Sequence, residues 1–288
     1  MRQEAIEEKV FSVKRPAFTL VELLVVISII ALLLGILMPA LAHARGQGYS
    51  IVCRSNVRQL YLANMGYSLE NDDYYVLAAE DIMIKSGGGR HRWHGMRESY
   101  GVDPDPLKNT FDPYKGPLYG YLGGGKVKEC PGMRSFIKDG AKNAFEAGCG
   151  GFGYNFEGVG SRMYKWSPDW SIPYDNPAKY SMRSVEISRA DTKVMFADTG
   201  YEVDGGIIEY SFCQPPKYVL NLYGAAEEKA NSKPKPTIHF RHFGSANVAW
   251  CDGHVSDEKL SFPESQMKVG DEAKIGWFGP ADNSLFRP

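Results

Sequence analysis

The chain has 288 residues, a formal net charge of −1 and a hydrophobic content of 43%. This length suits one sizeable domain or two small ones, and the composition is too polar for a protein that crosses a membrane many times. Aromatic residues at 12% exclude a wholly disordered chain, and the near-zero net charge gives no basic footprint for nucleic acid.

One apolar segment near the N-terminus departs from this average. In residues 18–42, 20 of the 25 side chains are apolar, and Glu22 is the only charged residue. A helix needs about 20 apolar residues to cross a bilayer, and no second segment is long enough. We therefore expect a single membrane helix joined to a soluble domain.

Three interpretations of this segment compete. Lys14 and Arg15 before an apolar core are typical of a cleaved secretory signal, and the alternate alanines in residues 40–44 resemble its cleavage site. However, the uncharged stretch Leu23–Met38 is longer than the core of such a signal. A plain signal anchor is the second interpretation. Neither gives a role to Glu22, although a carboxylate inside a membrane helix costs about 2.5–3.5 kcal/mol.

The third interpretation follows from the residues around Glu22. Lys14-Arg15-Pro16-Ala17 followed by Phe18-Thr19-Leu20-Val21-Glu22 resembles the class III signal of type IV prepilins and type II secretion pseudopilins. The resemblance implies that a prepilin peptidase cuts between Ala17 and Phe18 and N-methylates Phe18. It also implies that Glu22 pairs with the N-terminal amine of a neighbouring subunit during assembly. The chain departs from the family in having Ala17 where Gly is usual, and in its long leader.

The resemblance divides the chain into four parts: a cytoplasmic leader (1–17), a transmembrane and assembly helix (18–42), its amphipathic continuation (43–70) and an extracytoplasmic globular domain (71–288). The basic residues before the cut keep the N-terminus in the cytoplasm by the positive-inside rule. The expected location is therefore the bacterial inner membrane, with one span and the domain on the periplasmic side.

The continuation of the helix has helical periodicity, because Val57, Leu60 and Asn64 are three and four residues apart. Pro39 predicts either a kink in a continuous helix or the end of the helix, and both alternatives are open. The resemblance implies a pilin-like α+β fold, in which one long helix packs on a small antiparallel sheet with long irregular insertions.

Strands are expected in the C-terminal half of the chain, at residues 192–197, 207–212 and 237–242. Residues 247–256 predict a hairpin that turns at Asp252-Gly253, a dipeptide that suits a two-residue type I′ turn. Residues 71–130 are punctuated by Gly and Pro and predict irregular structure. Residues 139–190 are interpreted as a long insertion with little regular structure.

The hairpin carries a second resemblance. His242, nine further residues and then Asp252-Gly253 match the H-X9-DG pattern, which marks the C-terminal region of many large prepilin-like proteins. The resemblance does not imply a molecular role for the pattern.

The same region contains possible metal ligands. His239, His242, Asp252 and His254 are competent zinc ligands that are close in sequence. In a strand, however, His239 and His242 point to opposite faces. A structural role is therefore favoured, and we assign no catalytic residue, no metal ligand and no cofactor.

Other candidate ligands are weaker still. His91 and His94 have no carboxylate immediately beside them, so they are a poor metal site. By resemblance some pseudopilins bind calcium in a C-terminal loop, for which the loose candidates are Asp198, Asp204, Asp257 and Glu258.

The cysteine count is odd. The five cysteines all follow the apolar segment: Cys53, Cys130, Cys149, Cys213 and Cys251. Export favours disulfides, and an odd number leaves at least one thiol free or paired between chains. The pairing is open. The stretch Cys53–Leu60 and the dipeptide Cys130-Pro131 resemble elements of prepilin-like proteins.

The sequence thus predicts a pilin or pseudopilin subunit of a type IV pilus or a type II secretion-like filament, without catalysis. Its expected partners are prepilin peptidase, other subunits and the inner membrane. The alternative is a membrane-anchored binding protein or metal-dependent enzyme. It would use the region of His242 and Asp252, or an aromatic surface around Trp166 and Trp170.

Overall fold

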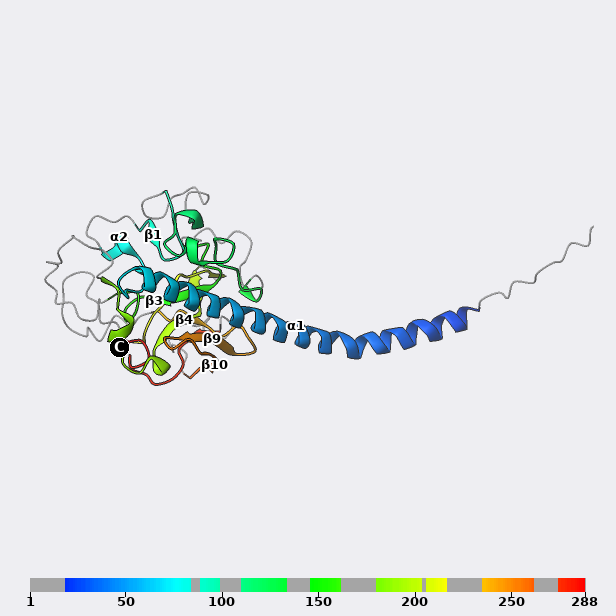
Figure 1. The fold of residues 1–288 in the computed structure, drawn as a ribbon. Helices are drawn as coiled ribbons and strands as arrows, with labels where there is room; N and C mark the ends of the chain where they lie inside the picture. The colour runs from blue at the N-terminus through cyan, green and yellow to red at the C-terminus, as the bar shows by residue number, and fades with distance from the viewer. Residues whose placement is uncertain are drawn as a thin grey trace, which may run out of the picture. The chain divides into compact units, whose positions relative to one another are not determined.

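The computed structural model describes residues 19–83, 89–98, 110–133, 146–161, 180–203, 206–216, 235–261 and 274–287. The chain divides into two compact units, Met1–Arg45 and Gly46–Pro288 (Figure 1).

The longest element is helix α1, Leu20–Glu70. It confirms the predicted long helix, although Phe18, where the helix was expected to begin, lies outside the described residues. Pro39 lies inside α1, so the alternative in which the helix ends there is wrong. A proline in a helix interior removes one backbone hydrogen bond. The continuous apolar sequence on both sides of Pro39 is compatible with helix despite that loss.

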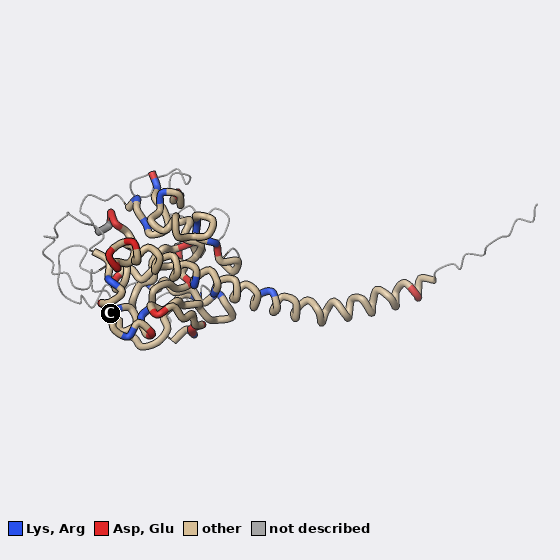
Figure 2. The backbone as a smooth tube through the Cα atoms, viewed as in Figure 1, with Lys and Arg blue, Asp and Glu red and all other residues tan. Residues whose placement is uncertain are grey.

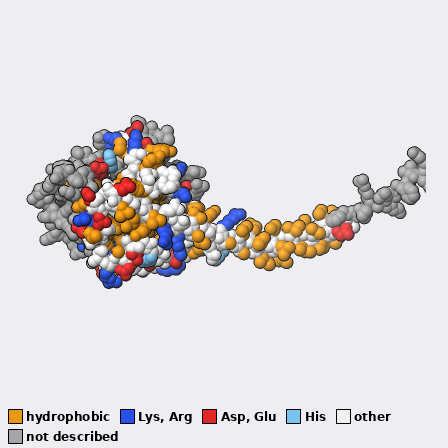
Figure 3. Space-filling model, in the orientation of Figure 1, with side chains coloured by type: hydrophobic (Ala, Val, Ile, Leu, Met, Phe, Trp, Pro, Cys, Tyr) orange, Lys and Arg blue, Asp and Glu red, His pale blue; other side chains and the backbone are white. Residues whose placement is uncertain are grey.

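In the first unit, every described side chain from Thr19 to Arg45 is exposed. Figure 3 shows apolar side chains covering this part of α1, and Figure 2 shows almost no charge along it. Among the described residues, α1 is the one helix that is long and apolar enough to cross a membrane. An apolar surface of this extent marks a segment that contacts lipid or other protein.

The second unit contains a five-stranded sheet in the order β10-β9-β4-β3-β7. The strands are β3 Phe152–Asn155, β4 Val194–Asp198, β7 Phe212–Cys213, β9 Ser245–Trp250 and β10 Val255–Lys259. Neighbouring strands are antiparallel except β3 and β7, which are parallel. These strands confirm the α+β class.

The C-terminal part of α1 packs on this sheet (Figure 1). Cys53, Val57 and Leu60 are at most 1% exposed and share one core with Tyr154 and Phe196. The other face of the sheet is covered by a second cluster, which includes Ile238, Phe240, Val248, Phe278 and Phe286. The central strands β4 and β9 are therefore buried on both faces.

The remaining elements are short. The helices and turns are α2 Glu80–Met83, η2 Pro113–Lys115, η3 Tyr119–Tyr121, η7 Ser184–Glu186 and η8 Ala190–Thr192. The strands are β1 His91–Arg92, β2 Gly95–Met96, β5 Tyr201–Val203, β6 Gly206–Ile208, β8 Ile238–His239 and β11 Ile275–Gly276.

Two predictions about strands need correction. The strand expected over residues 207–212 is two separate elements, β6 and β7. The insertion expected at 139–190 contains β3, which is an interior strand of the sheet. All four residues of β3 are buried, so the sequence lacks the alternation that identifies a half-exposed strand.

Candidate functional site

Thr19 and Glu22 cap the N-terminus of α1. The Glu22 Oε2 atom accepts hydrogen bonds from the Thr19 backbone N–H at 2.9 Å and from its hydroxyl at 2.7 Å. The Glu22 N–H donates to Thr19 Oγ1 at 3.2 Å. This is a capping box, in which a Thr and the Glu three residues later satisfy backbone donors that the first helical turn leaves unpaired.

This local role of Glu22 is additional to the assembly role expected from the sequence. Its sequence signal is the Thr-x-x-Glu spacing before an apolar run. The assigned processing residues, Ala17 and Phe18, lie outside the described residues.

The predicted C-terminal hairpin is present. Strands β9 and β10 pair antiparallel, from Ser245 opposite Lys259 to Ala249 opposite Val255. The predicted two-residue type I′ turn is wrong, because four residues, 251–254, separate the strands. Gly253 has a φ of 91°, whereas Asp252 is not left-handed. The Gly253 N–H donates to the Trp250 carbonyl at 3.0 Å, as in a turn that ends with a left-handed Gly.

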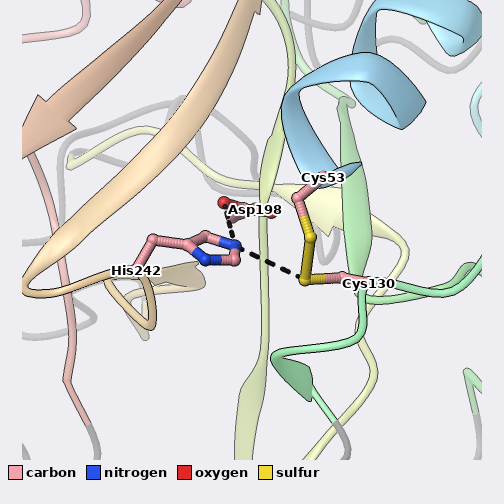
Figure 4. Close-up of side chains that lie close together, drawn as sticks. All are labelled: Cys53, Cys130, Asp198 and His242. Carbon is pink, nitrogen blue, oxygen red and sulfur yellow. Dashed lines mark hydrogen bonds and ion pairs between the residues drawn. A yellow bond between two sulfur atoms is a disulfide. The ribbon is translucent and has the colours of Figure 1, made fainter. Parts of the chain in front are cut away.

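The histidine of the H-X9-DG pattern lies in a buried cluster with a disulfide (Figure 4). His242 Nε2 is 3.4 Å from Cys130 Sγ and 3.4 Å from Asp198 Oδ2. Cys130 forms the disulfide with Cys53 of α1. The cluster therefore brings together the helix, strand β4, the segment before Pro131 and the turn that leads into β9.

Arg241 provides the positive charge of this cluster and is itself buried. Its guanidinium donates to Asp198 Oδ1 at 2.7 Å, to the Gly151 and Thr199 carbonyls, and to Cys130 Sγ at 3.2 Å. The second Asp198 oxygen accepts hydrogen bonds from the Asn247 backbone and side chain. The carboxylate is thus fully partnered without solvent, as a buried charge requires.

Burial shifts the pKa values of two groups in this cluster. Desolvation lowers the pKa of His242, although Asp198 partly offsets this, so the imidazole is neutral near pH 7. Desolvation also lowers the pKa of Arg241, against the opposing charge of Asp198. Because His242 is neutral, the charged groups of the cluster are Arg241 and Asp198, which form an ion pair at 2.7 Å.

Both ends of the H-X9-DG pattern contact α1. At one end His242 faces the disulfide of Cys53, and Phe243 packs against Gly46. At the other end a Cβ added at Gly253 would be 2.5 Å from the Tyr61 ring. Between them, Arg54 of α1 forms an ion pair with Asp257 of β10 at 2.9 Å. The pattern thus marks a hairpin that is docked along the helix.

The four possible metal ligands of the hairpin region, for which a structural role was favoured, are not brought together among the described residues. Asp252 Oδ1 pairs with His254 Nδ1 at 2.6 Å on the surface, while His242 is in the buried cluster. His239 is buried beside Arg241, with 3.3 Å between its Nδ1 and the guanidinium.

The weaker ligand candidates are also dispersed. His91 lies 3.6 Å from Glu80 at the surface. His94 is buried between aromatic rings, and burial lowers its pKa to about 3. Asp198 and Asp257 have the separate partners given above. Asp204, Trp166 and Trp170 lie outside the described residues.

Neither the grouping of Asp198 and Arg241 with His242 nor the cysteine pairing is predictable from the sequence. Cys53 and Cys130 are 77 residues apart, and segments so distant carry no local sign that they meet. The other three cysteines, Cys149, Cys213 and Cys251, are buried free thiols.

Comparison with known proteins gives one match. Residues 14–38 match the family described as the prokaryotic N-terminal methylation motif. This match covers the basic flank, the expected cut and the apolar half of α1. Comparisons with curated proteins and with solved structures gave no match.

Proposed function

We propose that this protein is a structural subunit of a type IV pilus or of a type II secretion-like filament. The observation that carries the proposal is the methylation motif at residues 14–38, which coincides with the exposed apolar part of α1. In a filament, the apolar helices of neighbouring subunits would pack together and replace contacts with lipid.

Before assembly, α1 anchors the subunit in the bacterial inner membrane as a single span. Lys14 and Arg15 keep the leader in the cytoplasm, and the second unit lies on the periplasmic side. A buried disulfide in that unit supports this orientation, because disulfides persist in oxidising compartments.

Prepilin peptidase would cleave between Ala17 and Phe18 and methylate the new N-terminus. The test is mass spectrometry of the chain isolated from membranes of the native bacterium. We expect a mature chain that begins at Phe18 and whose first residue carries one methyl group. Cleavage after Ala42 or Ala44 would instead identify a secretory signal, and an intact leader would identify a plain anchor.

Filament membership needs a second measurement. Filaments sheared from intact cells should contain the processed chain, and a strain that lacks prepilin peptidase should retain the chain in the membrane with its leader. A processed chain that never enters the sheared fraction would contradict the proposed filament role while leaving the processing site valid.

A further inference from the structure

The cluster around His242 contains four metal-ligating side chains in a compact arrangement. One ligand atom from each of Cys53, Cys130, Asp198 and His242 lies within 4.8 Å of all the others, and all four residues are buried. Two are soft sulfur donors, one is an imidazole and one is a carboxylate. Zinc takes all three kinds of donor, and structural zinc sites in proteins have four such ligands.

Two distances in the cluster agree with tetrahedral coordination. Zinc bonds of about 2.3 Å to sulfur and about 2.0–2.1 Å to nitrogen or oxygen place neighbouring ligand atoms about 3.3–3.6 Å apart. His242 Nε2 lies 3.4 Å from both Cys130 Sγ and Asp198 Oδ2. The two sulfur atoms must separate to about 3.8 Å, which they can do once the bond between them is reduced.

The surrounding charges favour the same ligand set. Zn²⁺ with two thiolates and one carboxylate has a net charge of −1, and Arg241, which touches both Asp198 and Cys130, makes the buried cluster neutral. Arg241 and Asn247 also hold the Asp198 carboxylate in one orientation, as outer hydrogen bonds do for metal ligands.

We propose that the dithiol form of this chain binds one Zn²⁺ through Cys53, Cys130, His242 and Asp198. The disulfide and the metal are then alternative cross-links of α1: the disulfide joins it to Cys130 alone, whereas the metal would also join it to Asp198 of β4 and to His242. This site does not depend on the proposed filament role. Only His242 is common to this site and to the possible ligands in the hairpin region, which were His239, His242, Asp252 and His254.

The zinc-bound dithiol form and the disulfide form interconvert by a two-electron oxidation of the two cysteines. Cysteines enter a chain as thiols, and binding of Zn²⁺ releases one proton from each of the two thiols. Oxidation by a disulfide-containing oxidant removes two electrons from the thiolates, forms the S–S bond of Cys53 and Cys130, and reduces the oxidant to two thiolates, which take up two protons from the solvent. The disulfide sulfurs no longer carry negative charge, so the metal is released.

The test uses the full-length chain in detergent, reduced with a phosphine under anaerobic conditions and then given zinc chloride. After gel filtration, elemental analysis should find one zinc per reduced chain and none on the oxidised chain. Cobalt(II) in place of zinc should give thiolate-to-cobalt charge-transfer absorption and the visible bands of tetrahedral coordination.

Substitutions locate the ligands. C130S should abolish binding of zinc, and H242Q should weaken it at least tenfold. C213S removes a buried thiol outside the cluster, and H254Q removes an exposed imidazole, so both should bind zinc as the wild type does. Zinc binding that C130S leaves unchanged would overturn the proposal, as would a reduced wild-type chain without zinc.

A measurement without substitutions covers the case in which a variant fails to fold. The reduced zinc-loaded wild type is treated with oxidised glutathione in the presence of a chromogenic chelator. One zinc should be released for each Cys53–Cys130 disulfide formed, as mapped by mass spectrometry. Disulfide formation with the zinc retained would place the metal elsewhere and refute this site.

Discussion

At the residue scale, Glu22 has one partner in the structure, Thr19, and a second in the proposed filament, and the two make different demands on its side chain. As the third residue of the helix it accepts two hydrogen bonds from Thr19, a role that a neutral Gln can also fill. As an assembly residue it would pair with the N-terminal amine of a neighbouring subunit, a role that requires negative charge. The two roles can therefore be separated by substitution.

We expect E22Q and E22A both to be cleaved normally and both to enter filaments at least tenfold less than the wild type, because an unpaired amine in an apolar bundle is costly. T19A removes the capping hydroxyl but keeps the charge, so it should assemble. The measurement is the ratio of sheared to membrane-bound chain, by immunoblot. If E22Q assembles like the wild type, the carboxylate acts only through the helix cap.

At the scale of elements, the docked hairpin explains why a glycine follows Asp252. Gly253 combines a left-handed φ of 91° with close approach to the Tyr61 ring of α1. Any side chain there adds backbone strain and pushes the hairpin off the helix. Asp252 itself accepts the His254 N–H at 3.0 Å and shapes the turn.

We therefore expect G253A to lower the free energy of unfolding by about 1–3 kcal/mol. The matched control is G123A, because Gly123 has no atom within 4 Å of an added Cβ and no positive φ. That variant should change stability by less than about 0.5 kcal/mol. Urea denaturation of both variants, followed by tryptophan fluorescence, provides the comparison. Equal midpoints would mean that the hairpin can shift away from Tyr61 without loss.

At the scale of the whole molecule, the features that the sequence predicted are those with a local signature. The apolar run predicted α1, and Asp252-Gly253 predicted the hairpin, although not its turn type. Strand β3 was missed because its short run is buried on both faces and contains Gly153. The cluster of His242 was missed because its members come from four distant segments, and a sequence pattern carries no record of such long-range contacts.

The large sequence separation of Cys53 and Cys130 also determines how much their disulfide stabilises the fold. It joins cysteines 77 residues apart and ties α1 to the core of the second unit. In the chain-entropy model, closing a loop of this length removes enough freedom from the unfolded chain to stabilise the fold by about 4.5 kcal/mol. Phosphine reduction, with a chelator present to keep zinc away, should lower the unfolding free energy by that order.

Urea titration of the oxidised and reduced full-length chain in detergent measures the difference. The double variant C53S/C130S should unfold near the midpoint of the reduced wild type, and reductant should not change it. The free thiols Cys149, Cys213 and Cys251 are present in every sample, so they cannot cause the shift. If reduction leaves the midpoint unchanged, the contacts of Val57, Leu60 and Asn64 with the core suffice to hold α1, and the cross-link adds no stability of its own.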